Sequence, residues 1–241
     1  MRIMIKRSVA VYEEYRKPFL SLLLKACEGA RDAVGVTARP YVKAESNGKT
    51  FDVVVYSEFD SMAEYEDKFL HTLLKNDSFL DGAESASDMI VDNPRDELFV
   101  RLETDDYFMH RKGEIALEEQ EEDTSAQKKY MVERMFHAKP GKLRDTMAAN
   151  FKLMEDEFNK TGTAPKYFCT RFAAGRIGGS TQVRSFDDAN DLDKQLMNYD
   201  DKFDHSMLIA PIEDTYFRRV DAEFIESLDE EKAPEILVPQ I

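Results

Sequence analysis

Histidines are the residues of this chain best suited to acid–base or ligand chemistry, and there are four: His71, His110, His137 and His205. His137 follows Glu133 by four positions in the run YMVERMFH, and a β-strand would place both side chains on one face. A carboxylate beside an imidazole can orient it as a general base. Glu133 and His137 are therefore a predicted catalytic pair, with a histidine at an exposed strand end as the alternative.

Arginines within apolar strand patterns are the second group that could do chemistry. Arg7 in RIMIKRSVAV and Arg134 in YMVERMFH share a strand face with apolar residues, where an unpaired charge is costly. A guanidinium fork there could bind a substrate carboxylate. Arg7 and Arg134, together with Arg184, are the predicted substrate-binding residues. The alternative is an internal ion pair with Glu58, Asp52 or a carboxylate of the chain between the two halves.

Tyrosines form the third group. Tyr41 and Tyr56 lie in neighbouring strand-like runs and could orient a phenolic substrate or donate to a developing oxyanion; aromatic packing is the alternative. No P-loop, GxGxxG, GxSxG, HxH or HExxH pattern occurs, and the two cysteines form no CxxC. The sequence therefore predicts neither a metal site nor a cofactor of the kind that such motifs bind.

These residues belong to two copies of one pattern. A shift of 127 positions places Phe59 on Phe186 and Arg7 on Arg134, and it also superposes a hairpin turn and the start of a helix. Near the end of each half the shift changes, so that FVR after Leu98 matches FRR after Tyr216. The agreement of several elements under one shift indicates an internal duplication.

Each copy is predicted to contain a strand, a helix, a hairpin, a second helix and a last strand. In the first copy the first strand is residues 2–11 and the first helix is KPFLSLLLKACEGA. The hairpin is VTARPYVKA and FDVVVYSEF around ESNGKT, the second helix follows Asp60, and the last strand is ELFVRLE. In the second copy the first strand is residues 129–137, the hairpin is PKYFCTRFA and STQVRSF around AGRIGG, and the last strand is DTYFRRV. The first helix has Pro140 in its first turn and an apolar stripe of Leu143, Met147, Phe151, Met154 and Phe158. The second helix follows Asp187 and carries Leu192, Leu196 and Tyr199. This order is the ferredoxin-like β-α-β-β-α-β unit, so the predicted class is α+β.

The predicted domain organisation follows from the duplication. Residues 1–104 and 129–221 form the two ferredoxin-like repeats, residues 105–128 an acidic linker, and residues 222–241 a C-terminal helix and tail. Helices cover only one face of such a sheet, so the other face requires a partner. The two copies of one chain can supply each other, or each can pair with a copy in another chain; a homo-oligomer is expected.

The composition limits the partners and the compartment. Lys and Arg total 33 against 48 Asp and Glu, a net charge of −15 at pH 7, which disfavours nucleic acid and anionic membranes. Two distant cysteines are typical of reduced, buried thiols, and no signal peptide or membrane span is predicted. A cytoplasmic protein that binds a small organic molecule is expected.

Two short motifs carry a resemblance to a known family. KPGKL at residues 139–143, after a strand and before a long helix, and FDDA at residues 186–189 resemble the NIPSNAP type of dimeric α+β barrel. The wider superfamily contains antibiotic-biosynthesis and haem-degrading monooxygenases, chlorite dismutase-like haem proteins and small cyclases. The resemblance implies a cavity, between sheet and helices or within the barrel, that holds a small organic molecule or haem.

Three functions are consistent with this resemblance. It implies first a cofactor-independent monooxygenase or a cyclase or isomerase of a biosynthetic pathway. The first alternative is a haem protein. Haem-degrading relatives carry their proximal ligand on the helix corresponding to the one near His71 or His205, so the resemblance makes these two possible haem ligands; histidines at a helix surface or cap are the other interpretation. The second alternative is a non-catalytic ligand-binding or assembly module.

Overall fold

The computed structural model describes residues 3–46, 48–101, 128–161, 167–171, 179–186 and 202–228. The chain forms two compact units, which are described separately. Unit 1 comprises Met1–Val100 with Phe217–Ile236, and unit 2 comprises Arg101–Tyr216 with Leu237–Ile241. Apart from Lys128, the predicted acidic linker at residues 105–128 lies outside the described residues, so its boundaries stay a prediction.

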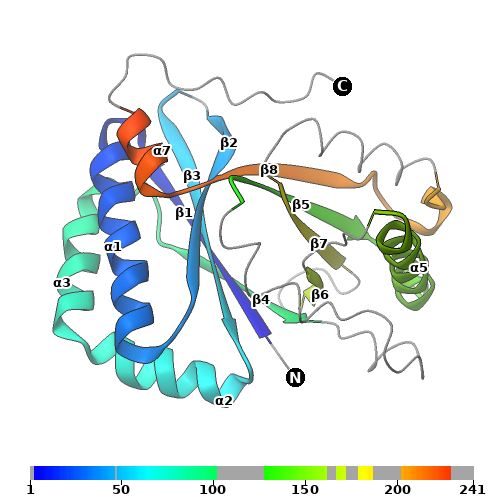
Figure 1. Cartoon of the computed structure of the whole chain (residues 1–241), viewed down its shortest axis with the longest axis horizontal. Helices are drawn as coiled ribbons and strands as arrows, with labels where there is room; N and C mark the ends of the chain where they lie inside the picture. The colour runs from blue at the N-terminus through cyan, green and yellow to red at the C-terminus, as the bar shows by residue number, and fades with distance from the viewer. Residues whose placement is uncertain are drawn as a thin grey trace. The chain divides into compact units, whose positions relative to one another are not determined.

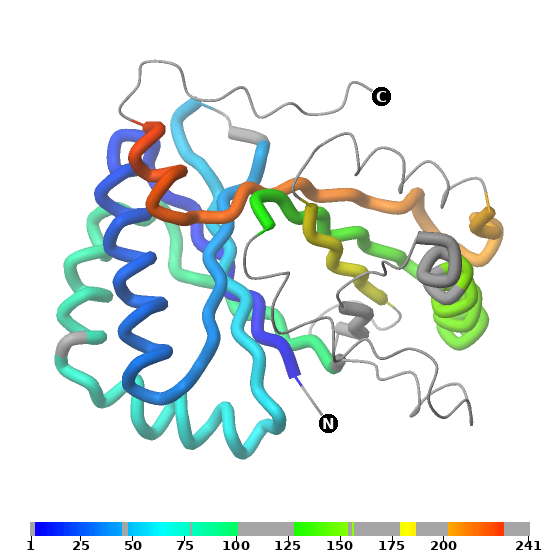
Figure 2. The backbone as a smooth tube through the Cα atoms, in the orientation of Figure 1, coloured from blue at the N-terminus to red at the C-terminus, as the bar shows by residue number. Residues whose placement is uncertain are grey.

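Unit 1 contains an antiparallel sheet built from β1 (Ile3–Tyr12), β2 (Ala38–Ser46), β3 (Thr50–Phe59) and β4 (Arg95–Arg101). Its strand order is β4-β1-β3-β2, so that the first strand lies between the third and the fourth (Figures 1 and 2). Phe217–Arg219, the end of β8 (Glu213–Arg219), pair with β2. This order is that of the predicted ferredoxin-like repeat.

The β2–β3 hairpin turns where the sequence predicts. Gly48 has a φ of 74°, in the left-handed region that a residue with a Cβ adopts only at a cost. Tyr41 and Val42 of β2 pair with Val54 and Val53 of β3.

The helices of unit 1 lie on one face of its sheet (Figure 1). α1 spans Arg16–Val34, and α3 spans Asp77–Ala86. Between β3 and α3 the chain forms α2 (Met62–Tyr65), a π-helix over Glu66–Thr72 and a 3-10 helix over Leu73–Lys75. The helix predicted to follow Asp60 begins at Met62, and Ser61, not Asp60, caps it: the hydroxyl of Ser61 accepts from the backbone N–H of Glu64.

The main core of unit 1 lies between the sheet and α1. It is completed by the end of the chain, because α7 (Ala222–Ser227) packs Phe224 and Ile225 against the cluster that contains Phe19 and Leu20 of α1. Asp221 caps α7 by accepting from the backbone N–H of Phe224.

Unit 2 repeats the same sheet. β5 (Tyr130–His137), β6 (Tyr167–Arg171), β7 (Gly179–Phe186) and β8 lie in the order β8-β5-β7-β6. α5 (Leu143–Thr161) packs over Phe136 of β5 through Ala149 and Leu153. The prediction that Pro140 lies in the first helical turn is wrong. Pro140 lies in the turn that precedes α5, where Gly141 has a φ of 78°.

The second helix predicted for this copy, with Leu192, Leu196 and Tyr199, lies outside the described residues. No helix within the described part of the chain has the length and apolar character needed to cross a membrane.

Candidate functional site

Unit 1 contains a cavity of about 130 Å³ between its sheet and its helices, called here the unit-1 cavity. Its floor consists of side chains on the helix-facing side of β1, β2 and β3: Ile5, Arg7, Ala38, Val55, Ser57 and Phe59. An engineered cavity of about 150 Å³ with apolar walls binds benzene, so a space of this size holds one small ring.

The roof of the unit-1 cavity is apolar and comes from three helical segments. α1 contributes Leu23, Ala26, Cys27 and Ala30, and the chain from α2 to α3 contributes Tyr65, Phe69, Leu73 and Phe79. Tyr65 and Phe69 are stacked, with ring centroids 5.4 Å apart. The π-helix begins directly after Tyr65 and contains Phe69, so this irregular segment sets the position of the aromatic wall.

One end of the cavity is polar because of Arg7. Its Nε and Nη2 donate to the two carboxylate oxygens of Asp96 at 2.7 and 2.6 Å, and its guanidinium lies 4.9 Å from the ring centroid of Phe69. Arg7 and Asp96 are directly opposite in the β1–β4 ladder, so backbone pairing aligns the two forks. The hydrogen-bonded Asp96 carboxylate raises the pKa of Arg7, and the pair as a whole is neutral.

Two other titratable groups line the cavity in their protonated forms. Burial, and secondarily the charge of Asp96, raise the pKa of the Tyr65 phenol, so this group remains a hydrogen-bond donor at neutral pH. Burial in the apolar roof raises the pKa of the Cys27 thiol to about 12. Cys27 is therefore a packing residue and not a ready nucleophile.

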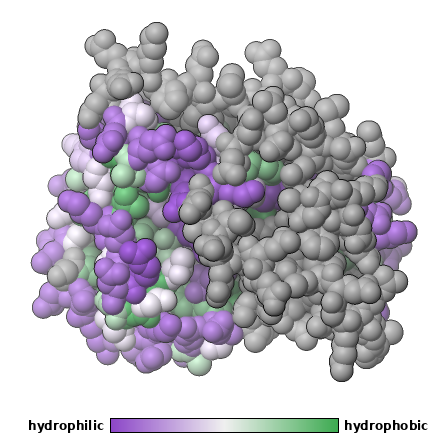
Figure 3. Space-filling view, in the orientation of Figure 1, coloured by the Kyte–Doolittle hydropathy of each residue, from purple (hydrophilic) through white to green (hydrophobic). Residues whose placement is uncertain are grey.

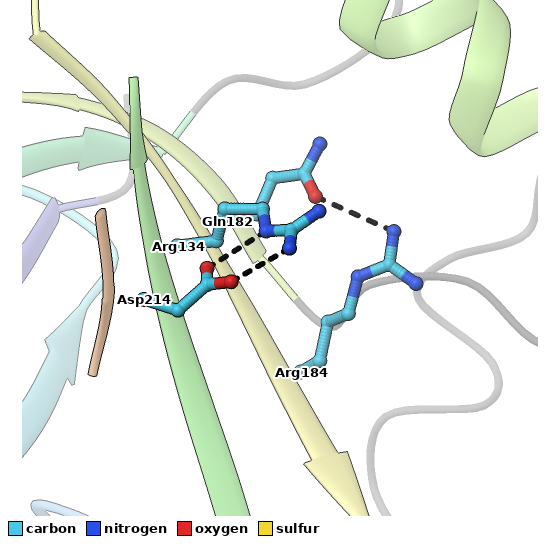
Figure 4. Close-up of polar contacts among 4 residues, drawn as sticks. All are labelled: Arg134, Gln182, Arg184 and Asp214. Atoms are coloured by element: carbon cyan, nitrogen blue, oxygen red, sulfur yellow. Dashed lines mark hydrogen bonds and ion pairs between the residues drawn. The ribbon is translucent and has the colours of Figure 1, made fainter. Parts of the chain in front are cut away.

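A second arginine–aspartate pair occurs in unit 2. Nε and Nη2 of Arg134 donate to the carboxylate of Asp214 at 2.7 and 2.6 Å (Figure 4), and Arg134 is only 1% exposed. Gln182, opposite Arg134 in the β5–β7 ladder, donates to Asn150 of α5 and accepts from Nη2 of Arg184 at 3.4 Å. The polar cluster thus lies on the sheet face that carries α5.

These pairs support the ion-pair interpretation of Arg7 and Arg134 but correct its partners. Arg7 pairs with Asp96 and not with Glu58 or Asp52; Glu58 instead forms an ion pair with Arg39. Asp96 and Asp214, which sequence reasoning missed, are three residues before Phe99 and Phe217. The sequence shift that matches these two phenylalanines also matches the two aspartates, and this match could have predicted Asp96 and Asp214 as equivalent partners of Arg7 and Arg134.

The predicted catalytic residues lie on the faces opposite the helices. In unit 1, Tyr41 and Tyr56 are 4% exposed with ring centroids 6.0 Å apart, and Nζ of Lys6 is 5.9 Å from the Tyr56 ring. In unit 2, Phe136 packs under α5, so Glu133 and His137 project from the other side. Neither group lines the unit-1 cavity.

His137 is buried, which corrects the alternative of an exposed strand end. It is 9% exposed, and its Nε2 lies 3.4 Å from Oε1 of Glu213. Glu133, four residues earlier in β5 and therefore on the same strand face, is 3% exposed. The structure thus places both members of the predicted pair in buried positions on one face of β5.

The predicted haem ligands do not meet the described cavity. His71 is an exposed residue of the π-helix, and His205 is an exposed residue of a 3-10 helix at His205–Met207. Among the described residues, no histidine lines the unit-1 cavity and no cluster of metal-binding side chains occurs, and the cavity is small for a porphyrin. The side chains that line the unit-1 cavity and the exposed His71 and His205 therefore do not form a haem site. His110 lies outside the described residues.

No family model and no curated protein matches the sequence. Among solved structures, a candidate monooxygenase from Fusobacterium nucleatum subsp. nucleatum has a TM-score of 0.64 at 11% identity, covering 91% of this chain and 93% of that one. A candidate monooxygenase from Lactobacillus acidophilus has a TM-score of 0.59 at 7% identity, covering 91% and 94%.

A candidate chlorite dismutase is similar to the same extent, with a TM-score of 0.59 at 12% identity over 95% of this chain and 99% of that one. Structural likeness at such identities establishes a shared fold, because folds persist where activities differ. The described part of the chain therefore has an α+β fold of the dimeric α+β barrel type, with a four-stranded antiparallel sheet in each unit.

Proposed function

We propose that this chain is a small-molecule enzyme that works without a cofactor and holds the reacting group of its substrate in the unit-1 cavity. The observation that carries the proposal is the cavity itself: an apolar space of about 130 Å³ whose lining includes Tyr65 and Arg7, with Arg7 hydrogen-bonded to Asp96. Pockets with apolar walls and a few convergent polar groups are the usual form of ligand sites.

The polar end favours a neutral group over an anion. Arg7 already has a carboxylate on its fork, so a hydroxyl or carbonyl suits the site better than a second carboxylate. The Tyr65 phenol could donate to the oxygen of a substrate enol or phenol as charge develops there. Transfer of a proton from such a substrate to solvent water begins both cofactor-independent oxygenation and cyclisation or isomerisation, the two reactions that the superfamily resemblance implies.

The test begins with binding. Phenol added to the full chain is expected to shift NMR signals of the cavity residues, and Ala30→Leu, which fills the cavity, is expected to abolish this effect. Ala63→Leu makes the same change on exposed α2, away from the cavity, and should leave binding intact. Binding that survives Ala30→Leu would remove the cavity as the site.

Turnover then separates the reaction classes and the competing residues. With a substrate found by screening phenols and enolisable ketones, consumption of O₂ identifies an oxygenase, and product formation without O₂ identifies an isomerase or cyclase. Tyr65→Phe is expected to lower kcat by roughly 10²-fold or more, as for loss of one oxyanion donor. If instead Tyr41→Phe, Tyr56→Phe or His137→Gln lowers kcat and Tyr65→Phe does not, the chemistry belongs to the originally predicted residues.

The haem alternative has a direct spectroscopic test. Because His71 and His205 are exposed and the cavity is small, added haemin is expected to give no Soret band that depends on either histidine. A sharp Soret band that disappears in His71→Ala or His205→Ala, while circular dichroism shows the fold unchanged, would establish haem binding instead.

A further inference from the structure

A second apolar space, the α1–α3 groove, lies directly outside the unit-1 cavity. It has a volume of about 410 Å³ and runs between α1 and α3. The facing surfaces of these helices carry small residues, which leave the space open: Ala26, Gly29 and Ala33 on α1, and Gly82, Ala83 and Ala86 on α3. On the face drawn in Figure 3, apolar surface shows between polar side chains over unit 1.

The groove and the cavity share a wall. Leu23, Ala26, Ala30, Leu73 and Phe79 line both spaces. Ala26 and Ala30 are four residues apart on α1, so they lie one above the other on one helix face and present only methyl groups to the boundary. A bound molecule can therefore extend from one space into the other by displacing the ends of Leu23, Leu73 or Phe79.

The volumes indicate what kind of molecule would use both spaces. Ligand pockets are typically about 300–1,000 Å³. The unit-1 cavity, at about 130 Å³, is below this range, whereas the groove, at about 410 Å³, is within it. The cavity alone holds a single ring, and the groove adds a larger, mostly apolar lining in which Lys25 and Asn76 are the polar residues.

We infer that the substrate of the proposed enzyme is an elongated, mostly apolar molecule with a neutral polar head. The head, a hydroxyl- or carbonyl-bearing ring, binds in the unit-1 cavity at Tyr65 and Arg7. The apolar body leaves the cavity over Ala26 and Ala30 and lies in the α1–α3 groove. This inference rests on the proposed function for the head and adds the substrate class.

A homologous series tests the inference: phenol, 4-propylphenol and 4-hexylphenol, titrated into the full chain by calorimetry. Affinity is expected to rise roughly fourfold per added methylene, the increment for burying a CH₂. Affinity that does not depend on chain length would overturn the substrate class while leaving the cavity proposal in place. Failure of phenol itself to bind is the separate result that removes the proposed function.

Two glycines allow the groove to be filled without disturbing the fold. A Cβ built at Gly29 or Gly82 meets no atom within 4 Å, and leucine is a better helix former than glycine. Gly82→Leu and Gly29→Leu are expected to cancel the gain from the alkyl chain and leave phenol binding unchanged. Ala63→Leu on exposed α2 should leave both the gain from the alkyl chain and the affinity for phenol unchanged. An unaltered chain-length dependence in Gly82→Leu and Gly29→Leu contradicts the inference.

Two other occupants of the groove would give different results. If the C-terminal ILVPQI segment filled it, Leu237→Asp would tighten 4-hexylphenol binding. If a second copy of the chain filled it, the affinity for 4-hexylphenol would fall as the protein concentration rises. Either result overturns the assignment of the groove to the substrate; we expect neither.

Discussion

The two arginine–aspartate pairs have the same hydrogen-bond geometry but different surroundings. The side chains of Arg7 and Asp96 are 33% and 36% exposed, whereas those of Arg134 and Asp214 are 1% and 19% exposed. Water screens the first pair and is largely excluded from the second. The cost of breaking a pair depends on this difference, because a buried charge without its partner has no solvent to compensate it.

Arg134→Met is therefore expected to destabilise the protein by about 3–5 kcal/mol, the usual cost of breaking a buried pair. Arg7→Met makes the matched change and should cost about 1 kcal/mol or less, as for partly exposed pairs. Urea unfolding followed by circular dichroism measures both. Equal losses would show that burial does not distinguish the two pairs.

The Cys27 thiol gives a prediction for alkaline pH. Burial raises its pKa from an ordinary 9.0 to about 12, so the unfolded chain loses this proton before the folded chain does. The contribution to stability is complete below pH 9 and is lost as the pH rises toward 12, by up to about 1.4 kcal/mol per pH unit. In Cys27→Ala the free energy of unfolding should fall less between pH 8.5 and 10.5 than in the native chain.

At the scale of elements, much of unit 1 was predictable. The apolar stripes, the Asn-Gly turn and the duplication predicted the strand–helix–hairpin–helix–strand order, and the chain order β1, α1, β2, β3, the helical segments from α2 to α3, and β4 confirms it. The orientation of β5 was not predictable, since both of its faces are mostly buried and alternation distinguishes a face only when one side meets water. The π-helix was also missed, because its sequence reads as an ordinary helix.

The candidate site was less predictable than the fold. Arg7 was found because a charge stood among apolar residues of a strand. Tyr65, Phe69 and Cys27 gave no such signal, because aromatic and sulfur side chains at helical spacing look the same whether they fill a core or line a cavity. Their role follows from how the π-helix meets α1, which is a property of tertiary packing.

Two glycines in unit 1 illustrate how the element decides the effect of a residue. Gly48, at the β2–β3 turn, has a φ of 74°, so Gly48→Ala is expected to cost about 1–2 kcal/mol. Gly82→Ala in α3, where an added Cβ meets nothing, should stabilise the protein by about 0.5–1 kcal/mol. Thermal unfolding of the two variants should shift in opposite directions. A shift of the same sign would contradict the assigned conformations.

At the scale of the whole molecule, the charge of −15 opposes association of the predicted homo-oligomer. Salt screens such repulsion, with a Debye length of about 10 Å at 0.1 M and about 3 Å at 1 M. The predicted self-association should therefore strengthen when NaCl is raised from 0.05 to about 0.5 M. Sedimentation velocity measures this. Weaker association at high salt would indicate that attractive ion pairs hold the copies together.

The position of α7 has a consequence for synthesis in the cell. Phe19 and Leu20 emerge from the ribosome early, yet Phe224 and Ile225, which pack into the same cluster, emerge only when translation is almost finished. A nascent chain carrying only the first repeat thus exposes apolar surface that its own sequence cannot yet cover. Ribosome-associated chaperones are expected to bind this intermediate until α7 has been synthesised, and a stop codon placed shortly before residue 222 should yield an aggregation-prone product.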